Sequence, residues 1–401
     1  MVKVAIMGYG TIGSGVYEVL TGNRDKIAAN VGQEVQVKYI LDLRDFPGSP
    51  VEDKIVHDFQ VIADDPEVQI VVETMGGLNP AYPFVKTCLE VGKNVVTSNK
   101  ALVAAHGTEL LAIAREKKVN FQFEASVGGG IPIIRPLYEC LMGEQIQEIT
   151  NFILTKMDKE GASFDAVLKE AQELGYAERN PEADVEGYDT CRKIAILTAM
   201  ATGKEVDFED IQTEGITKIT DVDFKYADKM GTSIKLFGTS RMNGDQVFAW
   251  VAPLMIGKSH PLYAVNDVFN GIMVKGNMLG TSMFYGSGAG KLPTASAVVA
   301  DIIEEAKNLH HNIPLGWTSE KQVIQPMEDS SHKYFVRISG VYESQKDKLQ
   351  ELLGTCQVIT LEGADEFALL TEVLNEKQFR DVKAAFEAAD GKVLQVIRAE
   401  V

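Results

Sequence analysis

The sequence predicts an α/β protein whose N-terminal domain is a Rossmann-type fold built on a parallel sheet. Two observations support this fold class. From Val2 to Glu124, short apolar runs alternate with helical patterns, which is typical of repeated β-α-β units. The segment Gly8 to Gly13 has the form G-x-G-x-x-G, follows the first apolar run directly and opens a helical pattern, as a dinucleotide-binding turn does.

Each element of this domain has its own sequence signal. Short apolar runs predict five strands, which are Val2 to Met7, Val35 to Leu41, Val68 to Glu73, Asn94 to Thr97 and Val119 to Glu124. Helical patterns between them predict Ile12 to Leu20, Pro80 to Val91 and Thr108 to Lys117. We expect this dinucleotide-binding domain to span residues 1–131 and to be completed by a helix at about 293–312.

After Ile146 the pattern changes to longer helices and alternating strands, which predicts an α+β domain over residues 132–292. Its expected helices are Ser163 to Leu174 and Val185 to Ala201. Its expected strands are Val247 to Ile256, Ile272 to Lys275 and Met278 to Tyr285. A polar, proline-punctuated stretch at 313–331 then predicts a linker.

Residues 332–401 predict a third unit. Their order is strand, helix, strand, strand, helix, strand, over Tyr334 to Ile338, Ser344 to Leu353, Gln357 to Leu361, Phe367 to Leu374, Lys377 to Ala388 and Val393 to Arg398. This βαββαβ order indicates a ferredoxin-like fold.

Composition and charge narrow the classes of function. The chain has 401 residues, of which 45% are hydrophobic and 24% charged, as in a water-soluble globular protein of two or three domains. Its net charge of −18 would repel nucleic acid or an anionic membrane, so neither is expected as a partner. No apolar run reaches the ~20 residues of a membrane span. The four cysteines show no C-x-x-C spacing, which fits a reducing cytoplasm.

The glycine-rich turn and the second strand bear on cofactor binding. Gly8, Gly10 and Gly13 would allow a tight turn, close approach of the backbone and helix packing, although a tight turn in an unrelated α/β fold is the alternative. Asp42 ends the second strand, where a carboxylate would bind a ribose 2′-hydroxyl. Arg44 could instead meet a 2′-phosphate, so the choice between NAD and NADP stays open at this point.

Two further clusters carry chemically useful groups. Three successive glycines, 128–130, follow Glu124, and backbone oxygens with a carboxylate would suit a hard cation; the alternative is a hinge between domains. Asp189 and Lys193 lie four residues apart on a predicted helix and therefore share one face. A carboxylate and a proton-transferring lysine suit an amino-alcohol substrate, whereas the alternative is an exposed ion pair.

Taken together, these segments resemble the homoserine dehydrogenase family, and the resemblance covers nearly the whole chain. The order and spacing of the matching segments make it specific. They are Gly8 to Gly13, Glu73 to Gly77, Ser98 to Ala101, Glu124 to Pro132, Thr150 to Thr155, Leu174 to Glu178, Asp184 to Lys193, Gly288 to Gly290 and Pro293 to Ala297.

The resemblance implies an enzyme of threonine and methionine biosynthesis that interconverts L-homoserine and L-aspartate 4-semialdehyde with NAD or NADP. It implies that Lys193 is the proton donor and acceptor, that Lys100 assists it, and that Glu178 and Asp189 bind homoserine. Homodimers or homotetramers are expected, formed through the sheet of the substrate domain. The residues expected around the dinucleotide are Gly8, Gly10, Thr11, Ile12, Gly13, Asp42, Thr74, Ser98, Lys100, Gly175 and Gly288. The family's monovalent cation site, usually for sodium, corresponds to Glu124 and the main-chain oxygens of Val127, Gly129 and Ile131.

Some features depart from the family pattern. Leu41 stands where many NADP-using members have a basic residue, which favours NAD, and Gln147 to Thr150 replace most of the usual Asn-Gly-Thr-Thr-Asn run. The C-terminal unit resembles an ACT domain but lacks the usual Pro-Gly turn over Ser339 to Ser344.

Two other functions are weighed against this one. An aspartate-semialdehyde dehydrogenase would need a nucleophilic cysteine, and neither Cys140 nor Cys191 has an obvious partner base in the sequence. An amino-acid sensor without catalysis is the second alternative, and the presence of both candidate lysines argues against it.

Overall fold

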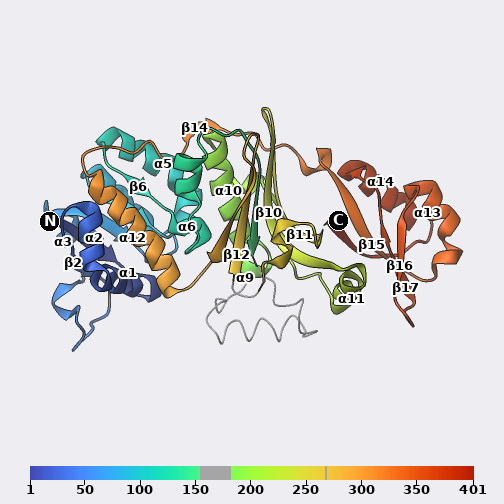
Figure 1. Cartoon of the computed structure of the whole chain (residues 1–401), viewed down its shortest axis with the longest axis horizontal. Coiled ribbons are helices and arrows are strands. Elements are labelled where there is room, and N and C mark those ends of the chain that lie inside the picture. Colours follow the sequence, from blue (N-terminus) through green and yellow to red (C-terminus); the bar gives the residue numbers. More distant parts are fainter. Residues whose placement is uncertain (154–181, 267–268) are drawn as a thin grey trace. The chain divides into compact units, whose positions relative to one another are not determined.

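The computed structural model describes residues 1–153, 182–266 and 269–401 (Figure 1). The helix predicted at Ser163 to Leu174 lies outside these residues. Contacts divide the chain into two compact units, which are described separately. Unit 1 comprises Met1–Ile146, Ala195–Phe208 and Lys275–Gln322, and unit 2 comprises Gln147–Ile194, Glu209–Val274 and Val323–Val401.

Unit 1 is built on a parallel sheet of six strands in the order β3-β2-β1-β4-β5-β6. Valine-rich runs form strands here because helices cover both faces, so that Val4, Ile6 and Val72 are fully buried. The strand order reverses between β1 and β4, where doubly wound sheets bind ligands. The strands are β1 (Val2–Met7), β2 (Val35–Leu41), β3 (Ile55–Val56), β4 (Val68–Glu73), β5 (Asn94–Thr97) and β6 (Phe121–Gln122).

The helices of unit 1 include one from late in the sequence. Helix α12 lies beside α1 and α2 (Figure 1), and its Ala295, Val298 and Ile302 pack in the same core as β1. The helices are α1 (Thr11–Gly22), α2 (Arg24–Val31), α3 (Gln60–Ala63), α4 (Ala81–Glu90), α5 (Lys100–Lys117), α6 (Ala125–Gly128) and α12 (Lys291–Lys307). The predicted α/β fold with an N-terminal parallel sheet is confirmed.

Unit 2 contains a mixed sheet in the order β12-β7-β10-β11-β19-β15-β17-β16. Its first strands are β7 (Ile146–Ile153), β10 (Thr232–Asn243), β11 (Gln246–Gly257) and β12 (Phe269–Gly276), and β13 (Gly280–Ser287) follows in the sequence. Helix α10 (Tyr188–Thr202) packs closely on β10 at Gly238. A Cβ atom at Gly238 would lie 2.9 Å from Cγ2 of Thr190, so a larger residue would push this helix away.

The end of unit 2 has the βαββαβ order, and its strands run β19-β15-β17-β16, as in a ferredoxin-like fold. We call it the C-terminal fold. Its elements are β15 (Ser331–Ser339), α13 (Lys346–Leu353), β16 (Gln357–Thr360), β17 (Glu366–Leu370), α14 (Glu376–Glu387) and β19 (Val393–Glu400).

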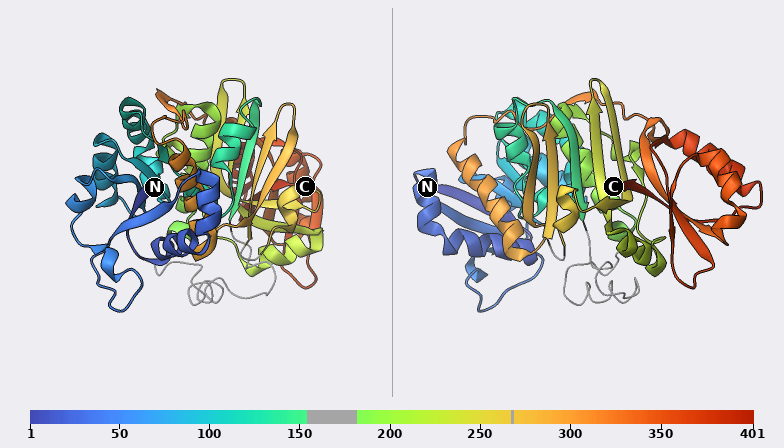
Figure 2. Two further views of the ribbon diagram at one scale, coloured as in Figure 1. Left: turned by 60° about the vertical axis from the view of Figure 1, so that its left-hand side comes forward. Right: turned by 45° about the vertical axis from the view of Figure 1, so that its right-hand side comes forward.

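Both faces of the C-terminal fold are covered. Helices α13 and α14 lie on one face (Figure 2), where Tyr334 stacks on Phe379. Helix α11 (Asp221–Met230) covers the other face and packs Tyr226 against Phe335. Strand β19 also pairs in parallel with β11, so the C-terminal fold continues the mixed sheet.

Two of the helix boundaries that differ from the sequence prediction have a local structural cause. Helix α5 begins at Lys100 and not at Thr108, because the side chain of Asn99 caps it by accepting the N–H of Leu102 at 3.2 Å. The helix predicted from Val185 is divided into α9 (Glu182–Val185) and α10, because Gly187 has a φ of +81°.

Of the helices that the structure describes, none combines the length and apolar character that a bilayer crossing requires.

Candidate active site

The glycine-rich turn lies at the carboxyl end of β1, at the switch point of the sheet. Gly8 has a φ of +95°, which side chains rarely allow. A Cβ atom on Gly13 would overlap the carbonyl oxygen of Gly8, whereas one on Gly10 would meet nothing within 4 Å. Thr74, after β4, donates its hydroxyl to the carbonyl oxygens of Met7 and Gly8 at 3.1 and 3.0 Å. The turn is therefore tightly closed on its inner side and open at the N-terminus of α1, where a pyrophosphate would fit.

Asp42 and Arg44 are bound to each other beside this turn. Arg44 Nε donates to Oδ1 of Asp42 at 2.9 Å, and Arg44 Nη2 donates to Oδ2 at 2.9 Å. Asp42 Oδ2 also accepts the N–H of Tyr9 at 2.8 Å. The Arg44 guanidinium is the main reason that the pKa of Asp42 lies well below its usual range. The two groups that the sequence presents as alternatives thus form one ion pair at the end of β2.

Ser98 and Lys100 follow β5, next to a buried carboxylate that organises the loops there. Glu73 is fully buried and accepts the hydroxyl of Thr97 at 2.6 Å. Its other oxygen accepts the N–H groups of Met75 and Gly76 at 2.7 and 3.1 Å. Glu73 thereby fixes the loops after β4 and β5. These loops, with the glycine turn, place Thr74, Ser98 and Lys100 at the same edge of the sheet.

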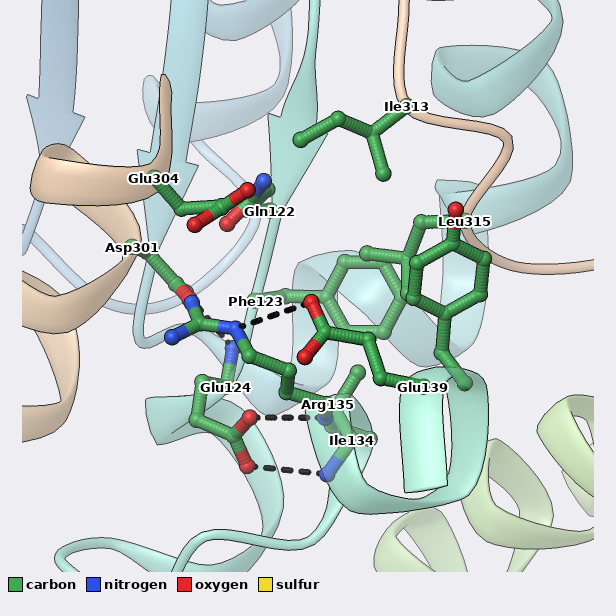
Figure 3. A pocket seen from close by; sticks show the side chains of 11 residues that line it. Gln122, Phe123, Glu124, Ile134, Arg135, Glu139, Asp301, Glu304, Ile313 and Leu315 are labelled. Atoms are coloured by element: carbon green, nitrogen blue, oxygen red, sulfur yellow. Dashed lines mark hydrogen bonds and ion pairs between the residues drawn. The ribbon is translucent and has the colours of Figure 1, made fainter. Parts of the chain in front are cut away.

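The Glu124 carboxylate is held by backbone amides. Its oxygens accept the N–H groups of Ile133, Ile134 and Arg135 at 2.6, 2.8 and 2.8 Å. Figure 3 shows the carboxylate beside Ile134 and Arg135. A carboxylate has about four acceptor positions, so Oε2, which takes one of these three bonds, keeps one position for a cation.

The glycine loop after Glu124 offers further oxygen ligands. Among the described residues, no N–H group bonds to the carbonyl oxygens of Val127, Gly129 or Ile131. A Cβ atom on Gly129, whose φ is +58°, would overlap the carbonyl oxygen of Gly288. The structure therefore brings together a residue expected at the cation site and one expected at the cofactor. Carbonyl and carboxylate oxygens are the donors that hard cations take, so these residues fit such an ion.

Arg135, Asp301 and Glu305 belong to no sequence motif, and the sequence does not predict them as site residues. Asp301 on α12 accepts the N–H of Glu124 at 2.8 Å and Nη2 of Arg135 at 2.9 Å, next to a small pocket (Figure 3). Burial and then the Glu124 charge raise the pKa of Asp301 to about 8, and Arg135 opposes them. Glu305 is fully buried one turn later. The one sequence signal for them is the presence of two acids, Asp301 and Glu305, among the apolar residues of the helix predicted at about 293–312.

Asp189 and Lys193 form a buried ion pair in the first turns of α10. Lys193 Nζ lies 2.9 Å from Oδ2 of Asp189, and their side chains are 10% and 8% exposed. The pair is therefore not the solvated surface pair that the sequence left as the alternative. Glu178 and Gly175 lie outside the described residues. The site residues thus fall into a dinucleotide group and a cation group in unit 1, and the Asp189–Lys193 pair in unit 2.

Comparisons with known proteins identify the relatives of this chain. Residues 8–124 match the family model "Homoserine dehydrogenase, NAD binding domain", and residues 132–303 match "Homoserine dehydrogenase". The homoserine dehydrogenase of Bacillus subtilis is 36% identical, over 95% of this chain and 94% of its own. A crystal structure of a homoserine dehydrogenase from Thiobacillus denitrificans is 36% identical, covers 100% of this chain and 98% of its own, and superposes with a TM-score of 0.91. A hyperthermophilic archaeal homoserine dehydrogenase in complex with NADPH is 27% identical over 76% of this chain and 97% of its own, with a TM-score of 0.63.

Proposed function

The chain belongs to the homoserine dehydrogenase family of NAD(P)-dependent oxidoreductases, and from this premise we propose which of its residues carry out the reaction. The substrate pair is L-homoserine and L-aspartate 4-semialdehyde. A bound nicotinamide supplies the hydride chemistry. The protein must therefore bind the amino acid, position the carbon that bears the hydroxyl, and move one proton.

Lys193 moves that proton. In the oxidative direction its Nζ takes the proton of the homoserine hydroxyl, and in the reductive direction it gives a proton to the developing alkoxide. The observation that carries this assignment is the buried pair with Asp189, at 2.9 Å, because a buried carboxylate holds the lysine in one orientation. Glu178 and Asp189 bind the ammonium and hydroxyl of homoserine. Lys100 adds positive charge at the reacting oxygen or orients the nicotinamide ring.

The dinucleotide binds at the carboxyl ends of β1, β4 and β5. Gly8, Gly10, Thr11, Ile12 and Gly13 cradle the pyrophosphate, and Thr74, Ser98, Lys100, Gly175 and Gly288 complete the site. Asp42 accepts the ribose hydroxyls, which favours NAD. Arg44, which is paired with Asp42 and whose side chain is 62% exposed, supplies the positive charge that a 2′-phosphate of NADP would need. We therefore propose that both cofactors are used, with a preference for NAD.

A monovalent cation, with sodium as the best candidate, is bound by Glu124 and the carbonyl oxygens of Val127, Gly129 and Ile131. The support is the unused acceptor capacity of these oxygens, described above. The ion would have a structural role, because it would hold the glycine loop that follows β6 in one conformation.

The same proposal covers assembly, regulation and location. Strand β13 and the turn before it expose Met278, Leu279, Met283 and Tyr285, and an apolar surface of this kind supports a homodimer or homotetramer. The C-terminal fold is ACT-like in its order of elements. The four free cysteines support a cytoplasmic location.

The test is the oxidation of NAD(P)H with aspartate semialdehyde by Lys193→Ala. We expect turnover to fall about 10²–10⁴-fold, as for the loss of a positioned acid or base, while dinucleotide binding is unchanged. Lys383→Ala is the matched control, because it breaks an exposed i,i+4 pair with Glu387 at 3.2 Å and should leave turnover unchanged. A Lys193→Ala enzyme that keeps a tenth of wild-type turnover would contradict the assignment.

The two buried cysteines, Cys88 and Cys191, do not suit the thioester chemistry of an aspartate-semialdehyde dehydrogenase. Burial raises the pKa of Cys191, and it raises that of Cys88 to about 12, so neither supplies a ready thiolate. Full activity after iodoacetamide treatment is the expected result, since only a thioester mechanism must be lost with its cysteine.

A further inference from the structure

Arg398 on β19 is a buried arginine that joins two parts of unit 2. Its guanidinium donates to both carboxylate oxygens of Glu214 at 2.9 and 3.0 Å. It also donates to both oxygens of Glu376, at the start of α14, at 3.0 and 2.9 Å. The hydroxyl of Tyr334 donates a further hydrogen bond to Oε2 of Glu376 at 2.7 Å. Bidentate bonds between charged groups fix geometry, so the position of Glu214 is tied to the C-terminal fold.

Glu214 belongs to a short segment, 213–216, that lies directly against the approach to α10. The N–H of Ile216 donates to the carbonyl oxygen of Val185 at 2.8 Å. A Cβ atom on Gly215 would overlap that same oxygen. The backbones of segment 213–216 and of Val185 are therefore in contact, with no side chain between them to absorb a displacement.

The contact continues into the first turn of α10. A Cβ atom added to Gly187 would lie 3.1 Å from Cγ2 of Thr213. The carbonyl oxygen of Gly187 accepts the N–H of Cys191 at 2.9 Å. Asp189 and Lys193 follow in this turn and the next. A shift of segment 213–216 would therefore move the start of the helix that carries the buried ion pair.

We propose that Arg398, acting through Glu214, is a positioning residue for Asp189 and Lys193, and that the C-terminal fold thereby holds the catalytic helix in its working orientation. The inference rests on the proposed role of Lys193. Arg398 is well suited to the task because β19 pairs with β11 on one side and β15 on the other, which fixes its backbone. The competing explanation is that its ion pairs only stabilise the fold.

Two isosteric variants of the full-length enzyme separate these explanations. Glu214→Gln weakens the ion pair between Arg398 and segment 213–216. Glu376→Gln weakens the ion pair between Arg398 and α14, which lies within the C-terminal fold. We expect Glu214→Gln to lower kcat by about threefold to thirtyfold, the range for coupling through packed networks, with the KM for NAD(P) unchanged. We expect Glu376→Gln to keep kcat within about twofold of wild type while lowering the melting temperature at least as much.

The pH profile gives a second readout. A purely structural role would leave the pH midpoint of kcat/KM in place, whereas a reoriented Asp189–Lys193 pair should move it, since the midpoint reports the group that transfers the proton. The inference is overturned if Glu214→Gln keeps wild-type kcat, or if both variants lower kcat in proportion to their loss of stability. Either result leaves the proposed function intact as long as Lys193→Ala is inactive. An active Lys193→Ala enzyme would overturn both.

Discussion

Glu305 makes the interior of unit 1 sensitive to pH. Its side chain is fully buried, and neither carboxylate oxygen has a hydrogen-bond partner among the described residues. Burial, with a contribution from the charge of Asp301, raises the pKa of Glu305 well above its ordinary value of 4.5. The folded protein therefore keeps a proton that the unfolded chain releases above that value. The stability that this proton supplies is complete at acid pH and is lost as the pH rises towards the folded pKa.

The size of the effect follows from linkage. One proton of difference between the folded and unfolded states changes the free energy of unfolding by ~1.4 kcal/mol per pH unit. As the pH rises from about 4.5 towards the folded pKa, the wild type should thus lose stability by up to this amount per pH unit on account of Glu305. Glu305→Gln keeps the shape of the side chain and removes this titration. The melting temperature of Glu305→Gln should therefore be close to that of the wild type at acid pH. It should exceed that of the wild type by several degrees as the pH rises.

Thermal unfolding at several pH values measures this difference directly. Glu304→Gln is the control on the same helix, because the Glu304 carboxylate accepts the side-chain N–H of Asn308 at 2.9 Å and so has a partner. If the melting temperatures of Glu305→Gln and wild type differ by the same amount at every pH, then Glu305 does not hold its proton in the folded state and the reasoning is wrong.

Two more predictions concern the cofactor and the C-terminal fold. Asp42→Ala should raise the ratio of kcat/KM for NADP to that for NAD by about tenfold, because it removes a carboxylate that repels a 2′-phosphate and releases Arg44; a wild type that already prefers NADP tenfold would show that Arg44 dominates. Removal of all residues after Asp329 should give an insoluble, inactive chain, because it uncovers α11 and the edge of β11 from Leu254 to Ile256. A soluble truncated enzyme with wild-type kcat would contradict this expectation.

The sequence predicts those elements whose signals are local. Strands β1, β2, β4 and β5 have the predicted bounds, because each is a short, mostly apolar run whose residues are mostly buried. The glycine turn is equally local, since Gly8 and Gly13 are required by the backbone itself. Helix α5 was predicted too short, because its beginning depends on the side chain of Asn99 and not on apolar periodicity.

Side-chain partners were much less predictable. The spacing of Asp189 and Lys193 places them on one face of a helix, but their burial depends on the packing of α10 against β10, which contributes residues from far along the chain. The spacing of Asp42 and Arg44 likewise does not reveal that they bind each other. Asp301 joins Glu124 only because α12 returns to the first domain, and no local pattern contains that information.

β10 and β19, which both pair with β11, become available at very different times during synthesis. β10 reaches β11 through a tight hairpin, whereas β19 pairs Arg398 with Leu254 across a long intervening stretch. A ribosome makes the chain from its N-terminus, so Leu254 to Ile256 of β11 lack this partner strand while the whole of the C-terminal fold is being translated. Closing such distant contacts is slow, and an open strand edge can pair wrongly in the meantime. The mixed sheet is therefore completed only after translation of β19.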